Sequence, residues 1–248
     1  IFSTTTPYVG QQVLVEYALF VDDRQVGPFG VEVQDVKVPD FDGFWTEELN
    51  QRARVETQRR KVIDGKRYTV RPLQLMSVFP LEEGDVIVEP MEIQATVSGR
   101  RTLRRRKLPL QAPQVNLKVQ PLPPGAPRGF PKGNVGLYEF DVTVDKRRVA
   151  VGEPFGVRLR VRGEGLIGRV ELPDFPESDA YRQLEPVENK KSGVNGRTVV
   201  GEKVAEVVLT PTKEGTLTIP ALTLHTFNPF EASYVARRSQ PVRVLVRG

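Results

Sequence analysis

The residues that could carry chemistry are few, because the chain of 248 residues has one histidine, His225, and no cysteine. A Ser-His-Asp triad would have to use His225, and no Gly-x-Ser-x-Gly nucleophile elbow accompanies it. A zinc site would lack a second histidine and any thiolate ligand. We therefore predict that the chain is not an enzyme and that it has no catalytic residue, metal site or cofactor.

Acidic and glycine-rich stretches are weaker candidates for ligand binding. Asp35, Asp40 and Asp42 do not reproduce the Asp-x-Asp-x-Asp-Gly calcium loop, and turns are where such residues normally occur. Residues 162–168 are rich in glycine but lack the Lys-Ser/Thr ending of a phosphate-binding loop. We interpret them as a loop that connects two strands.

Two groups of aromatic residues are candidates for binding a protein partner. Phe41, Phe44 and Trp45 form the densest aromatic cluster, in an expected turn, and Phe227 and Tyr234 belong to an expected hairpin around Asn-Pro. Aromatic residues are enriched at interface hot spots. The same side chains could instead cap a hydrophobic core, and the sequence leaves both interpretations open.

A basic segment, residues 100–107, is the third candidate, with six positive charges in eight positions. Arg104, Arg105 and Arg106 are taken as its possible contact residues. Its charges could protect an exposed sheet edge from pairing, or attract an acidic protein or lipid surface. No aromatic residue lies within it for base stacking, so nucleic acid is not expected as a partner.

Composition indicates which elements must position these residues. Apolar residues make up 39% and charged residues 27% of the chain, which is typical of a globular protein. The 21 glycines and 21 prolines favour short strands joined by turns. Residues 13–20 alternate as a half-buried strand does, and Asp64-Gly65 predicts a type I′ hairpin. The net charge of +5 is too small to indicate a nucleic-acid-binding protein.

A proline-rich stretch, residues 119–138, divides the chain. Its five prolines exclude both a helix and a central strand, which predicts a semi-rigid connector. The flanking halves share short motifs: Tyr-Val-Gly at 8–10 matches Ala-Val-Gly at 150–152, and Val-Pro-Asp-Phe at 38–41 matches Leu-Pro-Asp-Phe at 172–175.

The resulting prediction is an all-β protein with two tandem immunoglobulin-like β-sandwich domains joined by a short Pro-rich linker. The first domain is expected at residues 1–120, truncated at its N-terminus. The linker is expected at 121–134 and the second domain at 135–248.

Several motifs together resemble one protein family. They are Pro-Leu-Pro followed by Gly-Asn-Val-Gly-Leu-Tyr in the connector, Tyr-Val-Gly-Gln-Gln-Val at 8–13, Gly-Phe-Trp-Thr-Glu at 43–47, and Phe-Asn-Pro-Phe-Glu-Ala-Ser-Tyr at 227–234. These motifs are similar to those of the BatD family of bacterial aerotolerance, or oxygen tolerance, proteins.

The resemblance implies a non-catalytic scaffolding ectodomain in the bacterial periplasm. It implies an anchor in the inner membrane through a C-terminal helix outside this sequence, and association with von Willebrand A-domain Bat proteins. A functional link to a MoxR-type ATPase and to stress response belongs to the same expectation. The chain has neither an initiator Met nor a signal peptide, so we expect a piece of a longer protein. An adhesin or carbohydrate-binding module is the alternative, and a polyanion-binding protein is a third possibility.

Overall fold

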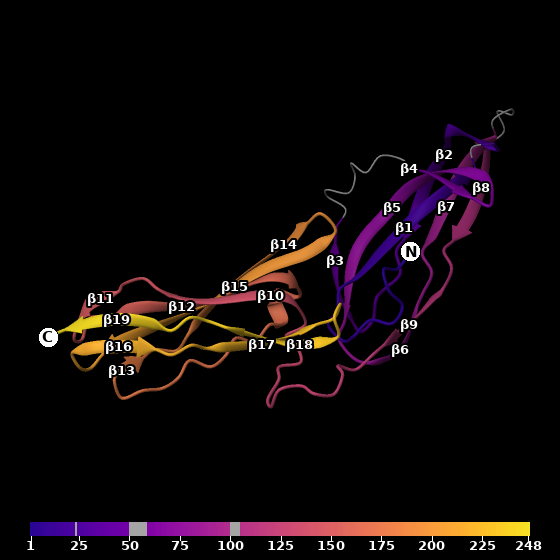
Figure 1. The fold of residues 1–248 in the computed structure, drawn as a ribbon. Helices are drawn as coiled ribbons and strands as arrows, with labels where there is room; N and C mark the ends of the chain where they lie inside the picture. The colour runs from indigo at the N-terminus through magenta and orange to yellow at the C-terminus, as the bar shows by residue number, and fades with distance from the viewer. Residues whose placement is uncertain (23, 50–58, 100–104) are drawn as a thin grey trace. The chain divides into compact units, whose positions relative to one another are not determined.

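The computed structural model describes residues 1–22, 24–49, 59–99 and 105–248. Strands dominate these residues, and one 3-10 turn, η1 (Ile167–Arg169), accompanies them. The contacts between residues divide the chain into two compact units, unit 1 from Ile1 to Leu122 and unit 2 from Pro123 to Gly248 (Figure 1). None of the described segments is a helix with the length and apolarity needed to cross a membrane.

Unit 1 contains three antiparallel sheets in its described part. Their strands are β1 (Val13–Asp22), β5 (Lys66–Pro80) and β3 (Phe44–Glu48), with β4 (Arg59–Ile63) also paired to β5; β2 (Val26–Lys37), β7 (Glu92–Gly99) and β8 (Arg105–Gln111); and β6 (Gly84–Val88) with β9 (Val115–Val119).

The core of unit 1 lies between its two larger sheets. Val15 of β1 and Val78 of β5 are fully buried, and they belong to one cluster with Met91 and Ile93 of the opposite layer. This packing defines a β-sandwich. The predicted type I′ hairpin is confirmed, because Asp64 and Gly65 between β4 and β5 both have positive φ, of 49° and 71°.

Unit 2 also contains three sheets in the part that the structure describes. Their strands are β10 (Gly136–Val144), β12 (Phe155–Gly165), β15 (Thr198–Pro211) and β13 (Tyr181–Gln183), with β14 (Val187–Asn195) also paired to β15; β11 (Arg148–Ala150), β19 (Val242–Arg247) and β16 (Gly215–Ile219); and β17 (Thr223–Asn228) with β18 (Ser233–Arg238).

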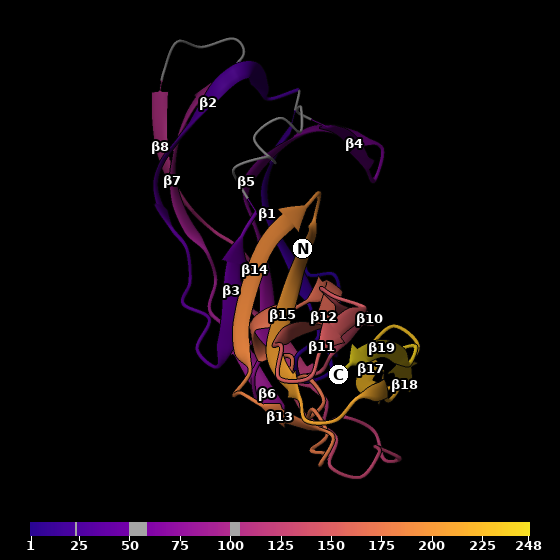
Figure 2. The same cartoon turned by 90° about the vertical axis from the view of Figure 1, so that its left-hand side faces the viewer.

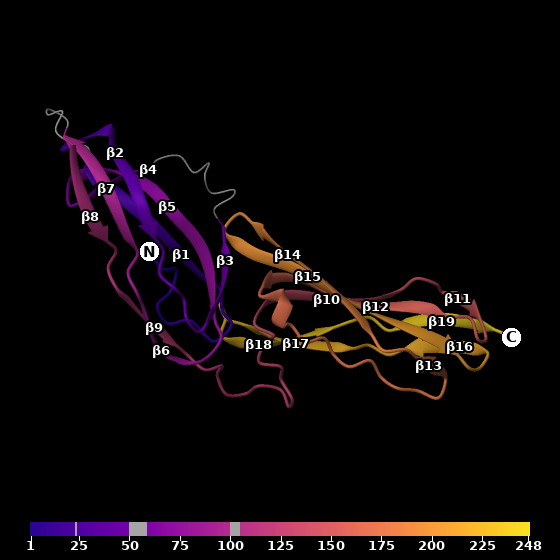
Figure 3. The ribbon, with the colours of Figure 1, turned by 180° about the vertical axis from the view of Figure 1, so that it is seen from behind.

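The core of unit 2 joins the long sheet to the two shorter ones. In the view from behind, β17 and β18 run below β10 and β15 of the long sheet (Figure 3). Phe155 and Leu209 of the long sheet pack in one cluster with Ile219 and Val244. Tyr138 packs in a second cluster with Leu224 of β17. The chain is therefore all-β, with two β-sandwich units, as predicted from the sequence.

The proline-rich segment packs on unit 2 over part of its length. The ring of Phe130 meets the ring of Tyr234 edge-on at 5.0 Å between centroids. The side-chain amide of Asn134 donates to the carbonyls of Glu171 and His225, at 2.9 and 3.0 Å. Residues 123–134 thus belong structurally to unit 2, and the stiffness expected of the linker at 121–134 stays a prediction.

Candidate partner-binding groove of the second unit

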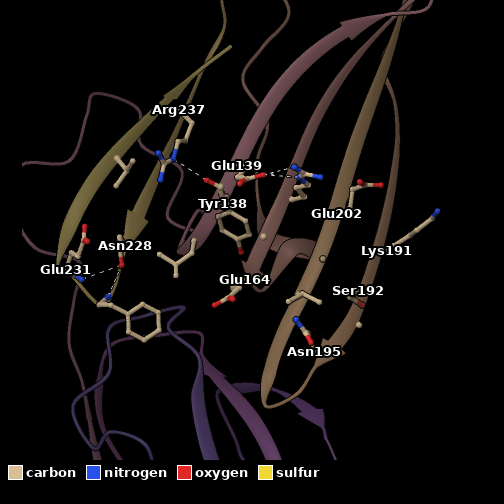
Figure 4. Close-up of a pocket in the computed structure, with 18 residues that line it drawn as sticks. Tyr138, Glu139, Glu164, Lys191, Ser192, Asn195, Glu202, Asn228, Glu231 and Arg237 are labelled. Atoms are coloured by element: carbon tan, nitrogen blue, oxygen red, sulfur yellow. Dashed lines mark hydrogen bonds and ion pairs between the residues drawn. The ribbon is translucent and has the colours of Figure 1, made fainter. Parts of the chain in front are cut away.

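An open groove lies on unit 2 between the long sheet and the turn that joins β17 to β18. Figure 4 shows Asn228, Glu231 and Arg237 along one side and Lys191 and Asn195 along the other. Its volume is about 1340 Å³, above the range of roughly 300–1,000 Å³ typical of small-molecule pockets. The size and openness of the groove favour a protein segment as its occupant.

The glycine-rich segment forms the base of the groove, which corrects the sequence interpretation of residues 162–168 as a connecting loop. Their first half completes strand β12. Gly163 has φ of 153°, and a Cβ there would lie 2.0 Å from the carbonyl oxygen of Leu137. Glycine is required because β10 and β12 approach each other closely at this point.

Beneath this close approach lies Tyr138, whose side chain is buried. Its hydroxyl donates to the carbonyl of Val135 at 3.3 Å. Burial raises the pKa of the Tyr138 hydroxyl well above its ordinary value of 10.0. The phenol therefore stays neutral at physiological pH and serves packing.

The outward face of the sheet carries a ladder of alternating charges across four strands. Glu139 lies opposite Arg162, Arg162 opposite Glu202, and Glu202 opposite Lys191. The Arg162 guanidinium lies 2.8 Å from the Glu139 carboxylate. Opposite charges at cross-strand positions stabilise a sheet modestly, and they give the groove a polar, nearly balanced surface.

A second charged pair extends this ladder. The Arg160 Nε donates to Asp141 Oδ1 at 2.9 Å. This hydrogen bond, with the charge of Asp141 and then those of Glu202 and Glu139, raises the pKa of Arg160 above its ordinary value. The arginine is fixed as a cation that is already paired within the sheet.

The turn between β17 and β18 forms the rim of the groove. The Asn228 side-chain oxygen accepts from the backbone N–H groups of Phe230 and Glu231, at 3.0 and 3.4 Å, and Ala232 has a positive φ of 50°. These contacts are an Asx turn, which fixes the loop. They hold the Phe230 side chain outward, 70% exposed.

The neighbouring strand closes the edge of the long sheet. The Arg237 Nε of β18 donates to the backbone carbonyl of Tyr138 at 3.2 Å. Because β10 pairs with β12 along its other side, this guanidinium satisfies a carbonyl at the edge of the sheet. The arginine thereby links the rim of the groove to its base.

The two aromatic residues predicted in this hairpin serve packing rather than a surface. Phe227 is fully buried, and its ring lies 5.1 Å from that of Tyr234. The Tyr234 hydroxyl donates to the carbonyl of Pro123 at 2.7 Å. Sequence reasoning missed Phe230 as the exposed residue, although the Asn-Pro step that precedes it was a signal for an outward turn.

The other aromatic cluster lies in unit 1 and splits into two roles. Phe41 and Phe44 pack against the core, with their rings edge-on at 6.1 Å, so they cap the sandwich. Trp45 lies in strand β3 rather than in a turn and is 50% exposed. Its indole N–H donates to Glu47 at 3.0 Å.

The basic segment is described only in part. Arg104 lies outside the described residues, whereas Arg105 and Arg106 are exposed at the start of β8. His225 lies in β17 and pairs with Ala236 across the hairpin. Within the residues that the structure describes, no group of three His, Cys, Asp or Glu side chains could hold a metal ion.

The fold defines the class of protein. The chain is all-β and has two β-sandwich units, and the groove lies on unit 2. A family model matches part of the chain: residues 142–246 match BatD, described as a BatD DUF11 like domain. The resemblance to BatD is thus confirmed. The match spans most of unit 2, including the strands from β12 to β19.

Solved structures show weaker similarity. The C-terminal domain of the Streptococcus agalactiae AgI/II polypeptide BspA is 8% identical, with 97% of this chain and 95% of that chain covered and a TM-score of 0.22. The type II cohesin dyad from the ScaA scaffoldin of Acetivibrio cellulolyticus is 10% identical, with coverages of 100% and 96% and a TM-score of 0.19. No curated protein matches the chain.

Proposed function

We propose that the chain is a non-catalytic interaction module of the BatD type and that the groove of unit 2 binds its protein partner. One observation carries this proposal: the segment that matches BatD, residues 142–246, supplies most of the groove. The same segment holds the exposed Phe230 on the rim.

The chemistry of the groove suits a protein surface. An exposed aromatic side chain on a rigid turn loses little conformational entropy when it is buried, which makes it a suitable anchor. The charges of Glu139 and Arg162 are already paired with each other, so a partner can cover them without leaving either charge unpaired.

The family resemblance supplies the identity proposed for the partner, a von Willebrand A-domain Bat protein. It also supplies the proposed setting, the bacterial periplasm beside the inner membrane, and the functional link to a MoxR-type ATPase and oxygen tolerance. In this setting the chain would act as a scaffold that presents the groove to the partner.

A titration of the purified chain with the soluble von Willebrand A domains from the same genome tests this. We expect saturable binding that Phe230→Ala weakens at least about 30-fold, the effect of losing a hot-spot residue worth about 2 kcal/mol. The matched control is Leu184→Ala, which removes another exposed apolar side chain of unit 2 that does not line the groove. No binding, or equal weakening by both substitutions, would contradict the proposal.

A carbohydrate-binding module is the second candidate, because Trp45 is half exposed on an edge strand. An indole face can stack on the apolar face of a sugar ring, and Glu47 could accept a hydroxyl hydrogen bond beside it. Binding to a glycan panel that is lost with Trp45→Ala and kept with Phe230→Ala would favour this candidate.

A further inference from the structure

The strand registers of unit 1 bring distant basic residues to one end of the sandwich. Asp22, the last residue of β1, pairs with Tyr68, and the β4–β5 turn lies just beyond. Val26, the first residue of β2, pairs with Gly99, where β7 ends and the chain leads into β8. These turns therefore lie toward the same end of unit 1, away from β6 and β9 in Figure 1. Figure 2 shows β4 on one side of this end and β8 on the other.

We call this end of unit 1 the basic tip. Its exposed cations come from the β1–β2 turn, the β4–β5 hairpin and the start of β8: Arg24, Arg60, Lys61, Lys66, Arg67, Arg105, Arg106 and Lys107. Its described carboxylates are fewer: Asp22, Glu32 and Asp64. Among the described residues, none of these cations forms an ion pair with a carboxylate.

The opposite end of unit 1 carries the reverse charge. Its turns and strand ends hold Asp40, Asp42, Glu82, Glu83 and Asp85. Unit 1 is therefore polarised along its strands, although the whole chain has a net charge of only +5. Such a separation of charge orients a protein toward an anionic surface.

Apolar side chains at the basic tip distinguish among anionic partners. Val62 and Ile63, next to the Asp64-Gly65 turn, are 64% and 38% exposed. Protection of an edge strand would account for the cations, but it gives no role to two exposed branched apolar residues at a hairpin end. Apolar residues flanked by cations are the combination that binds the interface of an anionic membrane.

The aromatic rings at this end are not arranged for nucleic acid. Phe20 and Tyr68 meet edge-on at 6.4 Å, and the Lys61 ammonium lies over the Phe20 ring at 5.9 Å. Stacking of bases needs open ring faces. From the cations, the apolar hairpin end and these rings together, we infer that the basic tip of unit 1 binds the surface of an anionic phospholipid membrane.

Co-sedimentation of the whole chain with lipid vesicles tests this inference. We expect binding to phosphatidylcholine vesicles with roughly one third phosphatidylglycerol, and little binding to pure phosphatidylcholine, because each cation near an anionic surface contributes about five-fold in affinity. The double substitution Arg60→Glu, Lys61→Glu should weaken binding at least about 25-fold. The control Arg182→Glu, Lys213→Glu makes the same change of charge on exposed residues of unit 2 and should leave binding unchanged.

A second pair of variants separates a membrane from a soluble polyanion. Val62→Ser, Ile63→Ser keeps every charge, and we expect it to weaken vesicle binding several-fold because the apolar end no longer enters the interface. The inference would be overturned if this substitution left vesicle binding unchanged and the chain bound inorganic polyphosphate or DNA as tightly as it binds anionic vesicles. Equal binding to neutral and anionic vesicles would also overturn it. Phe230→Ala changes unit 2 and not the basic tip, so we expect it to weaken binding of the von Willebrand A domain and to leave vesicle binding unchanged. The two proposals can therefore be contradicted independently.

Discussion

The hydroxyl of Tyr234 donates a 2.7 Å hydrogen bond to the backbone carbonyl of Pro123, 111 residues earlier in the chain. The ring of the same tyrosine contacts Phe130 and Phe227. One side chain therefore joins the proline-rich segment to the β17–β18 hairpin. The segment that the sequence predicts as a spacer is held against unit 2 by the hairpin that also presents Phe230.

The substitution Tyr234→Phe tests this attachment. It removes the hydroxyl and keeps the two ring contacts, so we expect the free energy of unfolding to fall by about 0.5–1.5 kcal/mol. Denaturant unfolding monitored by far-ultraviolet circular dichroism measures this change in the free energy of unfolding. Limited proteolysis should also cut residues 123–134 faster than in the wild type. Unchanged stability together with unchanged proteolysis would show that the bond does not hold the segment.

Gly163 is expected to be far less replaceable than other glycines of the same sheet. Gly163→Ala places a Cβ against the carbonyl of Leu137 at a φ that other residues rarely adopt, so we expect a loss of about 3 kcal/mol or more. Gly193→Ala is the matched control, because it lies in β14 with open space around it. Equal urea midpoints for the two variants would contradict the close approach of β10 and β12.

These residues show what the sequence could predict and what it could not. Asp64-Gly65 specified its turn because the local backbone conformation alone requires those residue types. The role of Gly163 depends on β10, more than twenty residues earlier, so local pattern suggested a loop instead. The all-β class followed from composition and alternation, which are local properties.

The candidate site was predictable only in part, for the same reason. The hairpin at 227–234 was found, but which of its aromatic residues faces outward is set by the turn that Asn228 organises and by packing against residues 123–134. The charge ladder depends on the registers of four strands. Registers arise from tertiary pairing and cannot be read from single segments.

Alkaline titration should separate the buried tyrosines from the others. Burial raises the pKa of Tyr17 to about 12, and it raises that of Tyr138 still further above 10.0. A phenol whose pKa is raised by folding stabilises the native state below its unfolded pKa of about 10, and this contribution is lost as the pH rises through the folded pKa. Stability should therefore fall above pH ~10.

Ultraviolet difference spectroscopy follows the ionisation of the six tyrosines. Tyr17→Phe and Tyr138→Phe should each remove one late-ionising phenol and leave the early part of the titration unchanged. If either variant instead lacks part of the absorbance change near pH ~10, the corresponding hydroxyl is solvated in the native state. That result would contradict the burial of this tyrosine.

Lys203 supplies the last prediction, because its ammonium is buried where the long sheet meets the 3-10 turn. The Nζ atom donates to the carbonyl of Val170 at 2.8 Å and lies 3.0 Å from the Glu188 carboxylate, which is half exposed. Lys203→Met keeps most of the side-chain volume but leaves the carbonyl of the buried Val170 without this donor. We expect the free energy of unfolding to fall by about 1–3 kcal/mol.

Lys190→Met is the control for this change, since Lys190 lies directly opposite Lys203 on β14 and is exposed. Its loss should change stability by less than about 0.5 kcal/mol, as is usual for surface positions. Denaturant unfolding of both variants measures the difference. Equal stabilities would mean that water replaces the ammonium at Val170, whereas a loss confined to Lys203→Met would show that this lysine fixes the 3-10 turn to the sheet beneath the groove.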